Sequence, residues 1–140
     1  LRAIQKGCAE VLAEGTYAAL FAIGSMVETA WQVRRKLAEK GIPTTVVNAR
    51  FAMPLDKNCL RKLAESHPLL VTMEENVASG GFGEHVAAFL EEEALHTKVL
   101  RIAIPDCFVE HGSVGELKKA LGLDADSVTE KILAELPEEL

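Results

Sequence analysis

Two adjacent carboxylates, Glu74 and Glu75, are the residues of this sequence most suited to acid/base chemistry. They follow the apolar run 69–73 and precede a helix that we expect to begin near Phe82. Adjacent carboxylates can serve as general acid and base because they push each other's pKa values apart. Neighbours on an extended strand, however, point to opposite faces of the sheet. We therefore expect one glutamate to cap the Phe82 helix or to meet a basic residue on another domain.

The glycines Gly80, Gly81 and Gly83 raise a second possibility, the binding of a dinucleotide. Gly81-x-Gly83 after a strand matches part of a pyrophosphate-binding turn, and Asp106 lies at a suitable distance for a ribose ligand. The pattern is incomplete, because Val86 stands in place of the third glycine and the two glutamates would repel a pyrophosphate. We interpret the glycines as allowing a sharp turn and a close approach of helix and sheet.

The remaining cysteine and histidine residues give no complete site. Cys107 and His111 could form a thiolate and base, but no orienting group or oxyanion site is evident beside them. His67, His85 and His96 belong to different predicted elements and lack the spacing of metal ligands, so we expect surface or capping roles. The sequence predicts no catalytic residue and no metal ligand in this chain.

The composition describes a globular protein with the length of one domain, which we place at residues 1–140. Hydrophobic residues make up 49%, charged residues 26% and aromatic residues 5%, and the net charge is −6. The densest basic run, Arg34-Arg35-Lys36, fits a solvated helix face, and the aromatic residues are too few to stack on nucleic acid. We therefore expect no nucleic-acid partner.

The apolar runs and the cysteines bear on location. The longest apolar run, 17–23, is far shorter than the ~20 residues that span a bilayer, so we expect no membrane partner. Cys8, Cys59 and Cys107 are odd in number and widely spaced, which indicates no disulfide framework and favours a reducing, cytoplasmic location. The sequence starts at Leu1 without a Met, which suggests a piece cut from a longer protein.

Hydrophobic periodicity predicts strands that alternate with helices. Ser25-x-x-Glu28 and Ser113-x-x-Glu116 match capping boxes, and Asp56 is a plausible helix cap. Right-handed crossovers then predict a three-layer α/β/α fold with a five-stranded, mostly parallel (mixed) sheet, in which the first strand pairs antiparallel at an edge. The expected strands are residues 8–13, 16–23, 44–49, 69–73 and 98–104.

Six segments of the sequence are informative as an ordered set: EGTYAALFAIGSMV (14–27), NARFAMPLD (48–56), VTMEEN (71–76), GGFG (80–83), IPDCFVEHGSVGEL (104–117) and LGLD (121–124). Through them the chain resembles the carboxy-terminal domain of the 1-deoxy-D-xylulose-5-phosphate synthases, within the transketolase family. Pyruvate dehydrogenase beta subunits end in a related domain, but the fifth and sixth segments are more similar to the synthases. Met53 departs from the pattern, because a basic residue is expected there.

The resemblance implies a transketolase carboxy-terminal-like fold and a parent enzyme that decarboxylates pyruvate and adds the two-carbon unit to glyceraldehyde 3-phosphate. It implies thiamin diphosphate and Mg²⁺ as cofactors, bound by the preceding domains, because no GDG-type motif occurs in this chain. The isolated domain is then expected to be inactive. The alternatives are the corresponding domain of a transketolase or of a pyruvate dehydrogenase beta-type subunit, and a stand-alone protein-interaction module.

The implied role of this domain is docking and dimer stabilisation rather than chemistry. The expected partners are the preceding domains of the same polypeptide and the second subunit of a homodimer. We expect the glycine turn to face such a partner, with Phe82 exposed at an apolar centre and a glutamate paired to a basic residue of that partner. The interface candidates are Glu74, Glu75, Asn76, Gly80, Gly81, Phe82 and Gly83.

Overall fold

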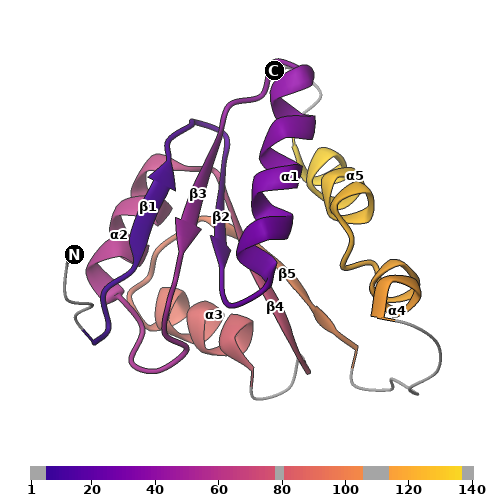
Figure 1. Cartoon of the computed structure of the whole chain (residues 1–140). Helices are drawn as coiled ribbons and strands as arrows, with labels where there is room; N and C mark the ends of the chain where they lie inside the picture. The colour runs from indigo at the N-terminus through magenta and orange to yellow at the C-terminus, as the bar shows by residue number, and fades with distance from the viewer. Residues whose placement is uncertain (1–5, 78–80, 106–113, 137–140) are drawn as a thin grey trace, which may run out of the picture.

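The computed structural model describes residues 6–77, 81–105 and 114–136, and the chain folds around one five-stranded sheet (Figure 1). The strands follow the order β1-β3-β2-β4-β5 across the sheet. β1 pairs antiparallel with β3, and the other pairs are parallel, which confirms the predicted mixed sheet with an antiparallel edge strand. The strands are β1 (Glu10–Ala13), β2 (Ala18–Ala22), β3 (Thr44–Asn48), β4 (Leu69–Val77) and β5 (Lys98–Ile104).

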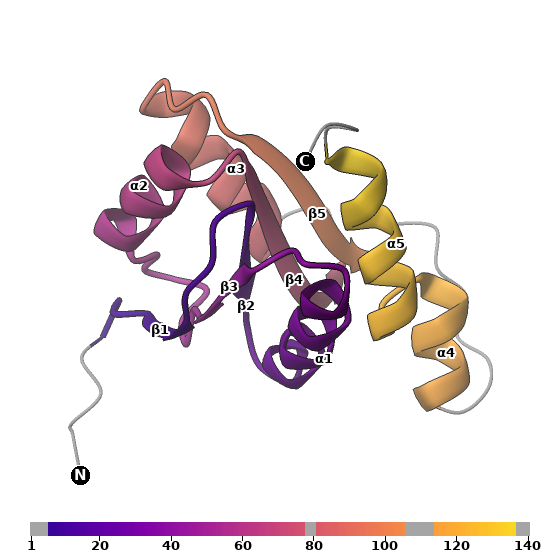
Figure 2. The same cartoon turned by 90° about the horizontal axis from the view of Figure 1, so that it is seen from above.

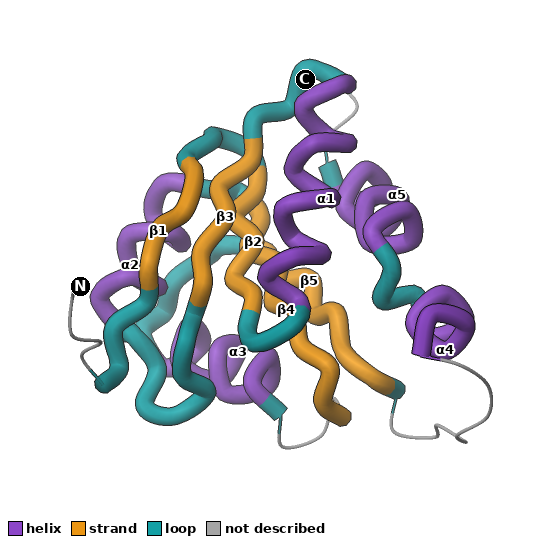
Figure 3. The backbone as a smooth tube through the Cα atoms, viewed as in Figure 1, coloured by secondary structure: helices purple, strands orange, loops and turns teal. Residues whose placement is uncertain are grey.

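Helices cover both faces of this sheet, as Figures 2 and 3 show from two directions. α1 and α5 lie on one face, and α2 and α3 lie on the other, so the predicted three-layer α/β/α arrangement is confirmed. No helix in the described part of the chain is long and apolar enough to cross a membrane. The helices are α1 (Met26–Glu39), α2 (Lys57–Ser66), α3 (Phe82–Glu92), α4 (Val114–Leu121) and α5 (Ala125–Glu135).

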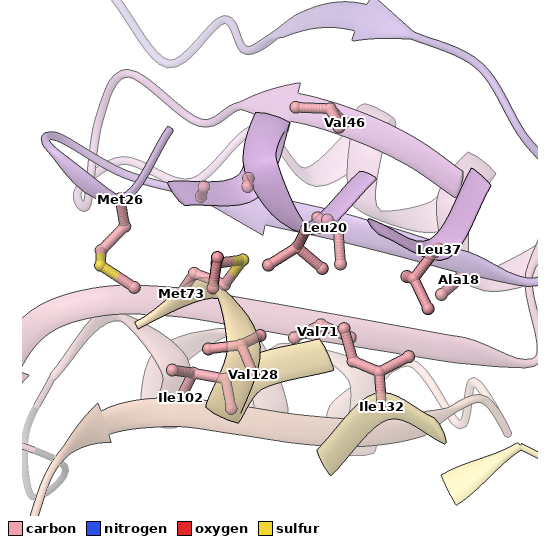
Figure 4. Packing of buried hydrophobic residues seen from close by; sticks show 14 of the residues in the cluster. Ala18, Leu20, Met26, Leu37, Val46, Val71, Met73, Ile102, Val128 and Ile132 are labelled. Atoms are coloured by element: carbon pink, nitrogen blue, oxygen red, sulfur yellow. The ribbon is translucent and has the colours of Figure 1, made fainter. Parts of the chain in front are cut away.

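Alternate side chains of the central strands belong to two separate hydrophobic layers, because successive residues of a strand point to opposite faces. Leu20 of β2, in register with Val46 and Val71 of its neighbours, packs with Leu37 of α1 and Ile132 of α5 (Figure 4). On the opposite face β2 and β4 pack against α2 and α3. That second layer contains Ala19, Phe21, Leu60, Leu63, Leu70, Phe82, Val86, Phe89 and Leu90.

Two local features differ from the sequence prediction. β4 continues to Val77, beyond the predicted end at residue 73, so Glu74 and Glu75 belong to the strand itself. The pairing with β5 shifts register between Met73 and Val77, which marks an irregularity at this point. The predicted capping box at Ser25 is also wrong in detail: Ser25 is the N-cap of α1, but its side chain makes no capping hydrogen bond.

Candidate functional site

The strand order places a topological switch point between β2 and β4. The chain leaves β2 for β3 on one side and then crosses to β4 on the other, so the loops that follow β2 and β4 diverge there. In open α/β sheets this crevice, at the carboxyl ends of the strands, is where ligands usually bind. It is bordered by Gly24 and Ser25 after β2 and by Glu74 and Glu75 at the end of β4. It is therefore the first place to look for function.

Glu74 is completely buried and caps α3 with both carboxylate oxygens. The backbone N–H of Phe82 donates to its Oε1 at 2.9 Å, and the N–H of Gly83 donates to its Oε2 at 2.5 Å. The first amides of a helix lack intrahelical acceptors and lie at the positive end of the helix dipole, so they attract an anion. Here the anion is the chain's own carboxylate. The expectation that one glutamate caps the Phe82 helix is thus confirmed.

Glu75 points to the other face and is exposed, which confirms the expected divergence of the two carboxylates. Its Oε1 lies 2.8 Å from Lys118 Nζ of α4. The hydrogen bond from Lys118, and secondarily one from the Ser25 side chain, hold the pKa of Glu75 below its usual value, while partial burial opposes them. Within this chain the basic partner of Glu75 is Lys118, and a pairing of Glu75 with a basic residue of another domain stays a prediction.

Because the folded state lowers the pKa of Glu75, this carboxylate should stabilise the fold only while it is ionised. The contribution should be present above pH 4.5, the ordinary value for a glutamate, and should be lost as the pH falls through the lower folded-state pKa. We expect Glu75→Gln to cost at most about 1 kcal/mol at neutral pH, since the ion pair is partly solvated, and nothing well below pH 4.5. Urea unfolding at neutral pH and well below pH 4.5 measures the free energy of unfolding of both proteins. An equal loss at the two pH values would contradict the prediction.

Phe82 is buried, so its predicted exposure at an apolar contact surface is wrong. Only 2% of Phe82 is exposed, and its ring stacks on that of Phe21 with the ring centroids 5.3 Å apart. The sequence does not show that Phe21 of β2 covers this ring. The motivation for a partner contact through Phe82 is lost, and a contact elsewhere on the turn stays a prediction.

The glycines of the turn differ in what they require. A Cβ on Gly83 would lie 2.7 Å from Thr72 Oγ1 and 3.0 Å from Glu74 Oε2, so the expected close approach of helix and sheet is confirmed here. Gly81, the N-cap of α3, has an extended backbone that any residue can adopt. Gly80 lies outside the described residues, and for Asn76 only the backbone, in β4, is described.

The histidines fall into two groups. His85 and His96 are exposed and His67 is the C-cap residue of α2, so the expected surface or capping roles are confirmed, although His67 is buried. Its Nε2 lies 2.7 Å from the hydroxyl of Thr45, and its Nδ1 lies 3.0 Å from the carbonyl oxygen of Leu63. These contacts anchor the end of α2 to β3. His67 is therefore a structural residue that links a helix to the sheet.

The other candidates give no assembled centre. Asp106, Cys107 and His111 lie outside the described residues. Cys59 is half-buried, and burial raises the pKa of its thiol to about 11, so it is protonated and a poor nucleophile at neutral pH. Within the described ranges, no group of three or more histidine, cysteine, aspartate or glutamate residues could hold a metal ion.

The polar groups described at the switch point are therefore already bonded to other groups of the same chain. Glu74 occupies the amides that could hold a phosphate, and Glu75 is paired with Lys118 and Ser25. A dinucleotide at this turn, or the diphosphate of another cofactor, does not fit these residues. Sequence reasoning missed Ser25 as a partner of Glu75 and missed Lys118 altogether, because no local pattern links them to β4.

A family model and several curated proteins match the sequence of this chain. The family described as "Transketolase, C-terminal domain" matches residues 7–128. A 1-deoxy-D-xylulose-5-phosphate synthase of Lachnoclostridium phytofermentans is 54% identical over 127 residues, which are 90% of this chain and 20% of that protein. The synthase of Dehalococcoides mccartyi is 43% identical over 96% of this chain and 21% of its own length. The chain therefore spans about a fifth of the length of these curated relatives.

Solved structures show the same fold. A structure titled "Split gene transketolase, inactive beta4 tetramer" superimposes with a TM-score of 0.85 and 30% identity over 94% of this chain and 42% of that chain. A transketolase from Campylobacter jejuni superimposes with a TM-score of 0.61 over 93% of this chain and 19% of that chain. At 18% identity, the latter match supports the fold alone.

Proposed function

The chain belongs to the transketolase carboxy-terminal domain family, and from this premise we propose that it is the carboxy-terminal domain of a thiamin-diphosphate-dependent 1-deoxy-D-xylulose-5-phosphate synthase. Such an enzyme, a transketolase-type transferase, converts pyruvate and glyceraldehyde 3-phosphate to 1-deoxy-D-xylulose 5-phosphate and CO₂, a step toward isoprenoids. The observation that carries the proposal is the 54% identity to a synthase across 90% of this chain.

Within that enzyme the domain serves docking and dimer stabilisation rather than chemistry. Thiamin diphosphate supplies an electron sink for the decarboxylation, and Mg²⁺ holds its diphosphate. The described residues do not fit that group, because the available helix amides are already bonded to Glu74 and no metal-ligand cluster is present among them. We therefore assign both cofactors to other domains of the enzyme.

The proposed partners follow from the size of the relatives. Because the chain corresponds to a fifth of a synthase, residues 1–140 would form one domain that packs on preceding domains of the same polypeptide. We further propose a homodimer of the full-length enzyme, located in the cytoplasm. Three widely spaced cysteines, with no pattern of a disulfide framework, are consistent with a reducing compartment.

The corresponding domain of a transketolase is the second candidate, favoured by the 30% identity to the split-gene transketolase structure. The synthases match at higher identity over a similar share of this chain, so we prefer the synthase. A pyruvate dehydrogenase beta-type subunit and a stand-alone interaction module are not better supported than the synthase.

An activity assay of the full-length protein tests the proposal. With thiamin diphosphate and Mg²⁺, it should form 1-deoxy-D-xylulose 5-phosphate and CO₂ from pyruvate and glyceraldehyde 3-phosphate. The same protein should not transfer a ketol group from xylulose 5-phosphate to ribose 5-phosphate at a comparable rate. The opposite preference would assign the chain to a transketolase.

The 140-residue chain alone is the matched control for that assay. It should be inactive, and calorimetric titration with thiamin diphosphate and Mg²⁺ should show no saturable binding, because the diphosphate ligands are expected on other domains. Binding of one equivalent of thiamin diphosphate by the chain alone would contradict the assignment of the cofactor ligands to other domains.

A further inference from the structure

The loop between β3 and α2 is apolar over five consecutive residues, 51–55, although it lies on the surface. Met53 is 63% exposed and Pro54 is also exposed, while Phe51, Ala52 and Leu55 are half-buried. Surface loops are normally polar, and a run of exposed apolar residues indicates a contact surface. We therefore expect another part of the protein, or a partner, to cover this loop.

A second exposed apolar residue lies on the neighbouring edge strand. Val11 of β1 is 48% exposed, and together with Met53 it makes up the exposed large hydrophobic side chains of the described residues. β1 pairs with β3, the strand from which the apolar loop departs, with Glu10 opposite Asn48. We call residues 51–55 the amino-terminal face; Val11 lies apart from it, in a pocket with Gly15, Cys59 and His67.

Hydrogen bonds fix the backbone at both ends of this loop. At the start, the N–H of Arg50 donates to Asn48 Oδ1 at 3.0 Å, and the N–H of Phe51 donates to the carbonyl oxygen of Ala49 at 2.7 Å. At the end, Asp56 Oδ1 accepts from the N–H of Cys59 at 3.0 Å. A preformed apolar surface loses little conformational entropy when it binds, so it suits docking.

The chain enters the domain along this same face. The N–H of Ala9 donates to Asp56 Oδ2 at 2.8 Å, and Glu10 forms an ion pair with Arg50 at 3.1 Å. Gly7 approaches Pro54 so closely that a Cβ on Gly7 would lie 3.1 Å from Pro54 Cγ. Figures 1 and 2 both show β1, the first element of the chain, on the side away from α4 and α5. Any upstream polypeptide is thus tethered beside Met53.

We propose that the amino-terminal face is the docking surface for the preceding part of the same polypeptide, which would present an apolar patch bordered by charges that complement Glu10 and Arg50. The inference rests on the proposed function in one respect, that this chain ends a longer protein about five times its length. The tether favours this occupant over a second copy, because a short linker gives an effective concentration on the order of millimolar.

Site-specific cross-linking in the full-length protein tests the occupant. With the photoreactive residue p-benzoylphenylalanine at position 53, irradiation should give a cross-link within one polypeptide, and mass spectrometry should map it upstream of Leu1. Ala120, exposed on α4 at the opposite side of the molecule, is the control position and should give several-fold less of this product. Cross-links from position 53 to a second copy, or no more product than at position 120, would overturn the proposal.

A second measurement uses conventional variants of the full-length protein. Met53→Glu should expose the junction before Gly7 and accelerate its cleavage by a protease, whereas Ala120→Glu should leave the cleavage rate unchanged. Equal rates for the two variants would also overturn the proposal. Neither readout depends on turnover, so a protein that docks but forms no 1-deoxy-D-xylulose 5-phosphate would refute the proposed function and leave the docking surface standing.

Discussion

Replacing Glu74 with alanine is expected to lower the free energy of unfolding by about 2–4 kcal/mol, because two buried amides lose their acceptors at once. Phe82 N–H and Gly83 N–H both bond to this carboxylate at the start of α3. Glu74 itself is completely buried, so water cannot simply take its place. The truncation also leaves a void beside Gly83, whose position against β4 depends on the capped geometry.

Glu75→Ala is the matched control, since it changes the neighbouring residue of the same strand. Glu75 is exposed and its partner Lys118 is also solvated, so this variant should cost at most about 1 kcal/mol. Glu74→Gln should fall between the two, because it keeps one acceptor oxygen but turns an NH₂ group toward an amide donor. Urea unfolding measures all three, and equal costs for the two alanine variants would refute the capping role.

Gly15→Ala is expected to cost about 2–3 kcal/mol, through a backbone contact that cannot relax. A Cβ at this position would lie 2.3 Å from the backbone nitrogen of Thr44 and 2.6 Å from the carbonyl oxygen of Pro43. The same turn is closed by a hydrogen bond from Thr16 N–H to that carbonyl oxygen, at 3.1 Å. Inserting a methyl group would therefore separate the loop before β2 from the start of β3.

Gly41→Ala provides the comparison for a glycine of a different kind. Gly41 has a φ of +75°, but nothing lies within 4 Å of its absent Cβ, so only the backbone conformation resists substitution. That should cost about 1 kcal/mol. Thermal unfolding of both variants decides the matter: if Gly15→Ala is no more destabilised than Gly41→Ala, the contact of Gly15 with Pro43 and Thr44 is looser than the structure shows.

Local chemistry in the sequence was sufficient for the elements and for several of their ends. Lys98–Ile104 was predicted with the bounds that the structure has, and Asp56 caps α2 through the N–H of Cys59, three residues away. The opposite orientations of Glu74 and Glu75 also follow from the period of two along a strand. These predictions succeeded because each depends on residues that are close together in the chain.

Predictions about exposure failed where they required knowledge of distant neighbours. Phe82 follows a glycine turn and would be exposed in an isolated segment, but β2 places Phe21 against its ring. His67 does cap α2, but its burial was not predicted, because its contact with Thr45 comes from β3, far away in the sequence. The resemblance to the transketolase family identified the fold without showing which side chains the sheet order brings together.

The sequence alone determined the alternating strands and helices, the mixed sheet, the family and the capping role of one glutamate, because backbone periodicity and short-range hydrogen bonds act within a few residues. Only the tertiary structure decided that Glu75 pairs with Lys118, and that Met53 and Val11 are exposed while Phe82 is buried. The order β1-β3-β2-β4-β5 brings distant segments side by side, and burial and charge neutralisation depend on those neighbours.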